Sequence, residues 1–263
     1  MITGASTGIG RALAFAWTER AARLVLNARS ADALEEVAAT CRVRGADAIA
    51  VPGDITSSEV QDALITAATA QFGSLDVLVN NAGVGLYGAV ESISAATLRT
   101  VFELNVIAPM MLTQRALPAL SAARGTVVMM SSIAGLVPMP RSGGYAATKF
   151  ALEALSMALR AELTASERSV RVCVIRPGVT ATPFTENAHV AEGATRTPVK
   201  GVPEMSAEEV AKRTIAAVDR GDAELDLTLA ARAIATLSRI SRPALRAVLT
   251  RMAPRLGVAS RRE

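Results

Sequence analysis

Short apolar runs alternate with longer Ala-rich stretches along most of this chain, and this alternation restricts the fold more than any other feature. The apolar runs lie at 23–28, 47–52, 75–80, 125–131 and 170–175, and their length and composition are typical of buried strands. The stretches at 8–21, 31–44, 57–72, 94–120 and 143–167 have helical patterns. Strands joined through helices form right-handed crossovers, so the sequence predicts an α/β fold with a doubly wound parallel sheet.

The chain is expected to consist of one domain and a basic tail. No linker rich in Pro, Gly or Ser interrupts the alternating pattern, so residues 1–225 are predicted to form a single domain. Residues 226–263 hold eight Arg against Asp226 and Glu263, and they are predicted to form a basic amphipathic helical extension broken at Pro243. Two alternatives remain for this tail: packing over a cleft or a partner subunit, or contact with an anionic membrane surface.

Composition excludes several classes of protein. With 51% hydrophobic and 20% charged residues the chain is neither disordered nor fibrous. Aromatic residues make up 3%, and the part before the tail is slightly acidic, so no nucleic-acid partner is expected. Cys41 and Cys173 are too few for a disulfide framework, and no metal site is expected. No signal peptide or long apolar stretch is found, which favours a cytoplasmic location, with membrane contact limited to the tail.

A glycine-rich loop opens the chain. In "TGASTGIG" (3–10), small residues let the backbone turn sharply and approach a pyrophosphate at the positive end of the following helix. A plain tight turn is the alternative. Only Met1 and Ile2 precede the loop, whereas a strand averages about five or six residues, so the first strand is expected to be truncated. The expectation is that the natural chain begins upstream of Met1, or else that the chain was trimmed.

Polar residues follow two further strands. In "NNAG" (80–83), Asn side chains are able to fasten neighbouring loops, and Ala82 and Gly83 leave room for a flat ligand. In "MMSSIAG", Ser131 and Ser132 follow a strand, where a hydroxyl can hydrogen-bond a substrate carbonyl. The alternatives are an ordinary turn and a capping serine.

"YAATK" places Tyr145 and Lys149 four residues apart, on one face of a predicted helix. A Lys ammonium beside a phenol is expected to lower the pKa of Tyr145 from its ordinary value of about 10, which would make Tyr145 a proton donor and acceptor. The alternative is a surface Tyr beside a solvated Lys.

Together and in this order, these motifs resemble the short-chain dehydrogenase/reductase family, over about residues 1–220. The resemblance implies a Rossmann-like fold and a nicotinamide-dependent oxidoreductase. It implies that Tyr145 is the catalytic acid/base, that Lys149 binds the nicotinamide ribose and tunes Tyr145, and that Ser132 orients the substrate oxygen. Asn105 in "FELNVIAP" matches the helix Asn that holds a water in a proton relay; a polar residue bonding within its helix is the alternative.

The resemblance also implies the residues that bind the cofactor. The phosphate and ribose side involves Gly4, Ser6, Thr7, Ile9 and Gly10; the adenosine half involves Asp54, Ile55, Asn81 and Gly83. The segment over the nicotinamide begins at Pro177 and Gly178 and brings Thr180 and Thr182 to the carboxamide. The second strand ends "LVLNARS", with Arg29 and no acidic residue, which favours NADP(H) over NAD(H).

The predicted function is therefore NADP(H)-dependent interconversion of a carbonyl and a secondary alcohol, with Ser132 and Tyr145 contacting the substrate. The alternative is a catalytically inert NADP(H)-binding sensor or scaffold. A homo-oligomer is expected. His189, the single histidine, lies in a polar stretch at 184–205 in the position of a mobile substrate loop. A lipophilic substrate is suggested by apolar residues expected near the cleft: Leu136, Val137, Pro138, Met139 and Phe184.

Overall fold

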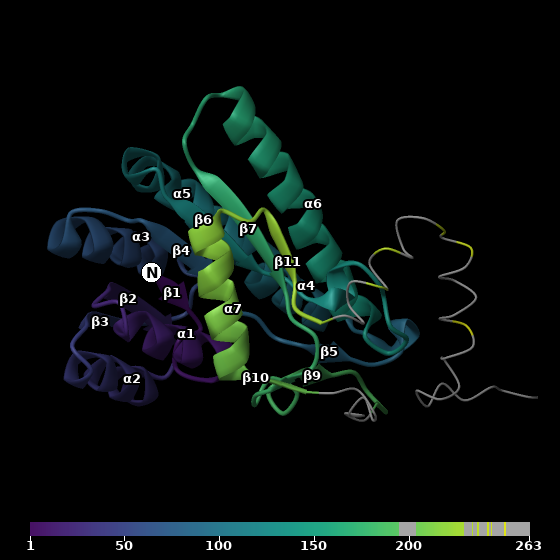
Figure 1. Cartoon of the computed structure of the whole chain (residues 1–263). Helices are drawn as coiled ribbons and strands as arrows, with labels where there is room; N and C mark the ends of the chain where they lie inside the picture. The colour runs from purple at the N-terminus through teal and green to yellow at the C-terminus, as the bar shows by residue number, and fades with distance from the viewer. Residues whose placement is uncertain are drawn as a thin grey trace, which may run out of the picture.

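A parallel sheet forms the centre of the molecule (Figure 1). A computed structural model describes residues 1–194 and 204–228, together with positions 233, 236, 241, 243 and 250. Within these residues the main sheet has the order β11-β7-β6-β4-β1-β2-β3, and every pairing in it is parallel. Its strands are β1 (Ile2–Thr3), β2 (Arg23–Ala28), β3 (Asp47–Pro52), β4 (Val77–Asn80), β6 (Thr126–Met130), β7 (Arg171–Arg176) and β11 (Glu224–Asp226). The doubly wound α/β fold predicted from the sequence is confirmed.

Helices cover both faces of this sheet. Helices α1, α2 and α7 pack together on one face, and α3, α4, α5 and α6 cover the other (Figure 1). Their bounds are α1 (Gly8–Thr18), α2 (Ala31–Val43), α3 (Ser58–Thr66), α4 (Ala95–Phe102), α5 (Ala108–Ala123), α6 (Gly143–Ala165) and α7 (Ala207–Arg220). Short helical turns complete them: η1 (Ala67–Gln71), η2 (Val90–Ser92), η3 (Glu103–Ile107) and η4 (Ile133–Gly135).

The sheet separates two apolar cores, as its strand sequences require. Along β6, Val127 and Met129 enter the core under α3, α5 and α6, while Val128 and Met130 enter the core under α1, α2 and α7. Side chains alternate between the faces of a strand, so a strand covered on both sides is apolar throughout. Cys173 is buried in one of these cores, as expected.

The central strand β1 is as short as the sequence predicts. Ile2 pairs with Leu26 and Val79, one strand on each side. The α-amino group of Met1 donates a 2.8 Å hydrogen bond to the carbonyl oxygen of Val77, and burial lowers its pKa to about 5. A cavity of about 280 Å³, lined in part by Met1 and Ile2, lies at the same end of β1.

One helical stretch, Ala95–Ala123, passes a length and hydropathy test for crossing a membrane, with a mean hydropathy of 1.2. It comprises α4, the π-helical turn η3 and α5, and its inner side buries Ala108, Leu112 and Ala116 in the core. Its apolar character therefore has an explanation within the fold. Figure 1 shows α5 lying along the sheet.

Two elements near the C-terminus differ from the sequence interpretation. Helix α7 was not predicted, although Ser206 caps it by accepting from the backbone N–H of Glu209 and Gly221 ends it. The predicted helical tail began at Asp226, but Glu224–Asp226 is strand β11, paired with β7. Its alternation explains the correction: Leu225 packs on the core, while Glu224 and Asp226 bond a charged partner. The rest of the tail lies outside the described residues except for isolated positions.

Strand order reverses between β1 and β4, and in an open α/β sheet ligands bind beyond the carboxyl ends of the strands at such a point. Two small sheets border this region. One pairs β8 (Thr180–Ala181) with β10 (Met205–Ser206), and the other pairs β5 (Leu86–Tyr87) with β9 (His189–Val190).

Candidate active site

A cavity of about 990 Å³ occupies this position at the carboxyl ends of the strands. Its described lining contains every site residue predicted from the sequence except Gly10 and Asn105, which lie behind the wall. The fold therefore brings together residues that are up to 178 positions apart along the chain, from Gly4 to Thr182. The volume lies at the upper end of the range of about 300–1,000 Å³ found for small-molecule and cofactor pockets.

The glycine loop is held in a conformation that larger residues would not permit. Gly4 has a φ of +64° and Gly8 a φ of +53°, in the left-handed region. A Cβ atom on Gly10 would lie 2.1 Å from the carbonyl oxygen of Gly4, so the helix start packs directly on the loop. Thr7 makes no side-chain capping hydrogen bond, which leaves the first N–H groups of α1 available to an anion.

Asn81 fastens this loop to the end of β4, as the sequence interpretation predicted. Its amide donates to the carbonyl oxygens of Thr3 (2.9 Å) and Gly4 (3.2 Å). In return, the Thr3 hydroxyl accepts from the backbone N–H groups of Asn81 and Ala82, both at 3.0 Å. The sequence interpretation missed Thr3; the signal available was its position at the start of the glycine motif.

Asn105 lies in the π-helical turn η3 and is buried. Its side chain accepts from the N–H of Val84 and donates to the carbonyl oxygen of Val84, both at 2.8 Å, and it donates to the Thr148 hydroxyl at 3.1 Å. It therefore ties the loop after β4 to α6, rather than bonding within its own helix. π-Helical turns are frequently found at functional sites.

Ser132 and Tyr145 face each other across the end of the cavity. The Ser132 hydroxyl accepts from the N–H of Ala134 (3.1 Å), so the capping role left open above is also filled. Burial raises the pKa of Tyr145 well above its ordinary value, and the hydrogen bond with Ser132 only partly opposes this. The Tyr145 ring meets Phe184 edge to face, with the ring centroids 5.6 Å apart.

Lys149 is buried, and its position corrects one prediction. Its ammonium donates a 2.9 Å hydrogen bond to the carbonyl oxygen of Met130 and stands 5.8 Å from the centroid of the Tyr145 ring. Burial lowers the pKa of Lys149 to about 8, and Glu153 opposes that shift. The prediction that Tyr145 has a pKa below its ordinary value is wrong for this arrangement, because the effect of burial on the phenol dominates.

The far end of the cavity is polar. Arg29, just after β2, is exposed at the rim, and no ion pair to it occurs within the described part of the chain. The Asp54 carboxylate accepts from the N–H (2.9 Å) and hydroxyl (2.8 Å) of Thr56, which fixes the loop after β3. Ile55 is buried beside it.

The apolar wall near Tyr145 differs from the one expected. Of the residues proposed from the sequence, only Phe184 lines the cavity, whereas Val137 is buried and Leu136, Pro138 and Met139 are absent from the described lining. The described lining instead includes Val84, Tyr87 and Leu104. His189 also lines the cavity, from strand β9, where it pairs with Leu86.

These features fit a dinucleotide. The loop offers a cradle that a Cβ atom would fill, a helix start offers free N–H groups, and the cavity extends from this loop to Tyr145. Among the described residues, no group of three His, Cys, Asp or Glu side chains is placed to hold a metal ion.

Comparison with known proteins agrees with a dinucleotide-binding site. The family model described as short chain dehydrogenase matches residues 1–193. An uncharacterized oxidoreductase of Methylorubrum extorquens is 38% identical over 192 residues, which cover 73% of this chain and 76% of that protein.

Two similar solved structures carry nicotinamide nucleotides. An alcohol dehydrogenase from Thermococcus sibiricus, complexed with 5-hydroxy-NADP, has a TM-score of 0.75 and 27% identity, covering 85% of this chain and 93% of its own. A short-chain dehydrogenase/reductase from Burkholderia phymatum, in complex with NAD, has a TM-score of 0.81 and 27% identity, covering 90% of each chain. A nicotinamide cofactor is thus supported, whereas the choice between its two forms is not decided by these relatives.

Proposed function

The chain belongs to the short-chain dehydrogenase/reductase family of oxidoreductases, and from this we propose that it interconverts a lipophilic carbonyl compound and its secondary alcohol with NADP(H). The observation that carries the proposal is the meeting of Ser132, Tyr145 and Lys149 in a cavity that the glycine loop also lines. When bound, the nucleotide would donate a hydride to the carbonyl carbon in reduction, or accept one from the alcohol carbon in oxidation.

Each residue at this end has a role in carbonyl reduction. Ser132 holds the carbonyl oxygen, and Tyr145 donates its phenolic proton to that oxygen as negative charge develops there. The raised pKa of Tyr145 keeps the phenol protonated at neutral pH, which is the form that reduction requires. The Lys149 ammonium, held by the carbonyl oxygen of Met130, stabilises the phenolate that remains.

The apolar wall supports a lipophilic substrate. Phe184 meets the ring of Tyr145, and Val84 and Leu104 add apolar surface to the same cavity, so a substrate is expected to present one oxygen and an apolar body. The test is NADPH oxidation against ketosteroids, acyl ketones, quinones and short aldehydes, with NADH alongside. Turnover of none of them, with NADPH still bound, would favour the inert sensor or scaffold instead.

Arg29 carries the preference for NADP(H). Replacement of Arg29 by Asp should lower the ratio of kcat/KM for NADPH to that for NADH by about 10- to 100-fold, because a cation that bonds the 2′-phosphate becomes an anion that repels it. Steady-state kinetics with both nucleotides measures this ratio. The control is Arg168→Asp, the same change at an exposed arginine outside the cavity. An unchanged ratio in Arg29→Asp would reject the assignment.

A homo-oligomer is part of the proposal. Large apolar side chains on η3, α5 and α6 are 37–62% exposed, and they are candidates for a subunit contact: Ile107, Met111, Phe150, Leu155 and Met157. Light scattering on the purified protein gives the mass directly. Contact of the basic tail with membranes stays a prediction, which co-sedimentation with anionic liposomes of chains with and without residues 230–263 tests.

A further inference from the structure

A buried arginine that the proposed reaction does not use lies directly behind the active site. Arg176 is the last residue of β7, and Pro177 and Gly178, which line the cavity, follow it. Its side chain is 2% exposed. A charge buried at this depth is costly unless it is paired, so its partners indicate which parts of the fold it holds in place.

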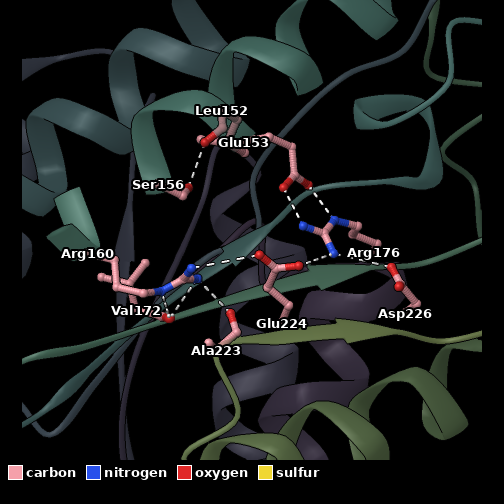
Figure 2. Close-up of polar contacts among 9 residues, drawn as sticks. All are labelled: Leu152, Glu153, Ser156, Arg160, Val172, Arg176, Ala223, Glu224 and Asp226. Carbon is pink, nitrogen blue, oxygen red and sulfur yellow. Dashed lines mark hydrogen bonds and ion pairs between the residues drawn. The ribbon is translucent and has the colours of Figure 1, made fainter. Parts of the chain in front are cut away.

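The first partner of Arg176 is on the helix that carries Tyr145 and Lys149. Its Nε and one terminal nitrogen donate to the two carboxylate oxygens of Glu153, at 2.8 and 2.7 Å (Figure 2). Glu153 follows Lys149 by four residues, so both lie on one face of α6, one turn apart. A two-point contact between planar groups fixes orientation as well as distance.

The remaining partners are on the edge strand β11. The other terminal nitrogen of Arg176 donates to Glu224 (2.9 Å) and Asp226 (3.3 Å). A carboxylate oxygen of Glu224 also lies 3.8 Å from a guanidinium nitrogen of Arg160, on α6. The same guanidinium donates a 2.7 Å hydrogen bond to the carbonyl oxygen of Ala223 (Figure 2). The guanidinium of Arg176 thus joins α6, β7 and β11, and Arg160 adds a second link between α6 and the β11 edge.

Glu153 also reaches the turn that carries Ser132. A Cβ atom on Gly135, in η4 directly after Ser132, would lie 3.0 Å from Cγ of Glu153 and 3.1 Å from the carbonyl oxygen of Lys149. The side chain of Glu153, whose carboxylate Arg176 holds, therefore packs closely against the turn that follows Ser132.

We propose that Arg176 is a positioning residue of the active site, which sets the geometry of Lys149, Ser132 and the Pro177–Gly178 segment through its two-point contact with Glu153. This inference rests on the proposed function for its catalytic readout. Apolar side chains of similar volume would hold the same elements together, but they would not fix their relative orientation. Lysine would keep the charge but not the planar fork.

The test replaces Arg176 by Lys and measures kcat and KM at a temperature at which circular dichroism shows the variant to be folded. We expect kcat to fall at least tenfold and KM for the nucleotide to rise. The matched control is Arg20→Lys, because Arg20 makes a two-point contact with Asp219 (2.8 and 2.7 Å) that is exposed and far from the cavity. It should change kcat less than twofold. A folded Arg176→Lys protein with kcat and KM within twofold of the unsubstituted values would overturn the proposal.

A second variant, Glu153→Gln, gives a readout that a merely structural role would not move. The charged and titratable groups described around Lys149 are Tyr145 and Glu153 on its own helix and Arg176 on β7. Loss of the positive charge on Lys149 at alkaline pH is expected to lower kcat/KM. Glu153 raises the pKa of Lys149, so neutralising Glu153 should move this alkaline fall in kcat/KM to lower pH. If kcat/KM of Glu153→Gln falls at the same pH as that of the unsubstituted protein, Glu153 does not act on Lys149 and the proposal is overturned.

Nucleotide binding separates this inference from the proposed function. If the unsubstituted protein reduces no carbonyl compound, the proposed function fails, and fluorescence titration with NADPH then judges the positioning role. A dissociation constant at least tenfold higher in Arg176→Lys, and unchanged in Arg20→Lys, would support it, and equal constants would overturn it. If both Arg176→Lys and Glu153→Gln fail to fold while Arg20→Lys folds, the contact acts in stability and the positioning role is rejected.

Discussion

Replacement of Tyr145 by Phe should lower kcat for carbonyl reduction by about 10²- to 10⁴-fold, the range that a positioned acid or base contributes. The change removes one oxygen atom from a ring that is held edge to face against Phe184, so the cavity should keep its shape. The dissociation constant for NADPH should stay within about twofold, because the glycine loop, Asn81 and Arg29 are untouched. Single-turnover kinetics and fluorescence titration measure the two quantities separately.

Tyr87 provides the matched control for this experiment. It is the only other tyrosine in the chain, it lines the same cavity, and its charge would raise the pKa of Tyr145. It lies on β5 and has no part in the proposed proton transfer, so Tyr87→Phe should lower kcat less than about tenfold. Equal losses of kcat in the two variants would mean that loss of either hydroxyl disturbs the cavity, and the effect would then not be specific to Tyr145. Near-normal turnover in Tyr145→Phe would overturn the mechanism.

The sequence predicts the sheet, and most of the predicted site residues line one cavity, because both depend on local patterns. The apolar run predicted at 23–28 has the bounds of β2, and the run predicted at 47–52 has the bounds of β3. Strand β2 is buried along all but its first residue, so it is a largely apolar run with clear ends, whereas β3, at the edge of the sheet, is partly buried. Asn81, Ser132 and Pro177 follow strands at the carboxyl edge, and parallel order brings those edges together. Asn105, Tyr145 and Lys149 come from helices, so helix packing has to bring them to the same edge.

The sequence interpretation was weaker where long-range contacts decide the structure. Strand β11 has three residues, and its Glu224 and Asp226 are polar because they meet Arg176, which only the fold places there. The pattern was therefore taken as the start of a helix. Helix α7 was overlooked although Ser206 and Glu209 carry the spacing of a capping box.

Charge effects in the site were the least predictable. The distance from Lys149 to Tyr145 along the helix was known from the sequence, but the direction of the ammonium was not. It is set by the carbonyl oxygen of Met130, at the end of β6, 19 residues before Lys149. Burial of the phenol, which determines the direction of its pKa shift, depends on the packing of loops that no single motif describes.

Lys149 should have the second large effect, on both rate and pH dependence. Lys149→Met is expected to lower kcat/KM by about 10²- to 10³-fold, comparable with the loss of one preorganised hydrogen-bond donor that stabilises developing charge. In the unsubstituted protein the ammonium is present below its pKa of about 8 and is lost above it. The kcat/KM for carbonyl reduction should therefore be level below pH 8 and fall as pH rises through that value, since the phenolate left on Tyr145 is then no longer stabilised.

Lys149→Arg tests whether this alkaline limb belongs to Lys149. A guanidinium stays protonated throughout the accessible pH range, so the variant should have lower activity but no fall near pH 8. The carbonyl oxygen of Met130 is able to accept a hydrogen bond from an ammonium or a guanidinium, so Lys149→Arg keeps a donor for this buried oxygen. If the fall near pH 8 persists in Lys149→Arg, another group titrates there, and the charge on Lys149 does not support the proton transfer by Tyr145.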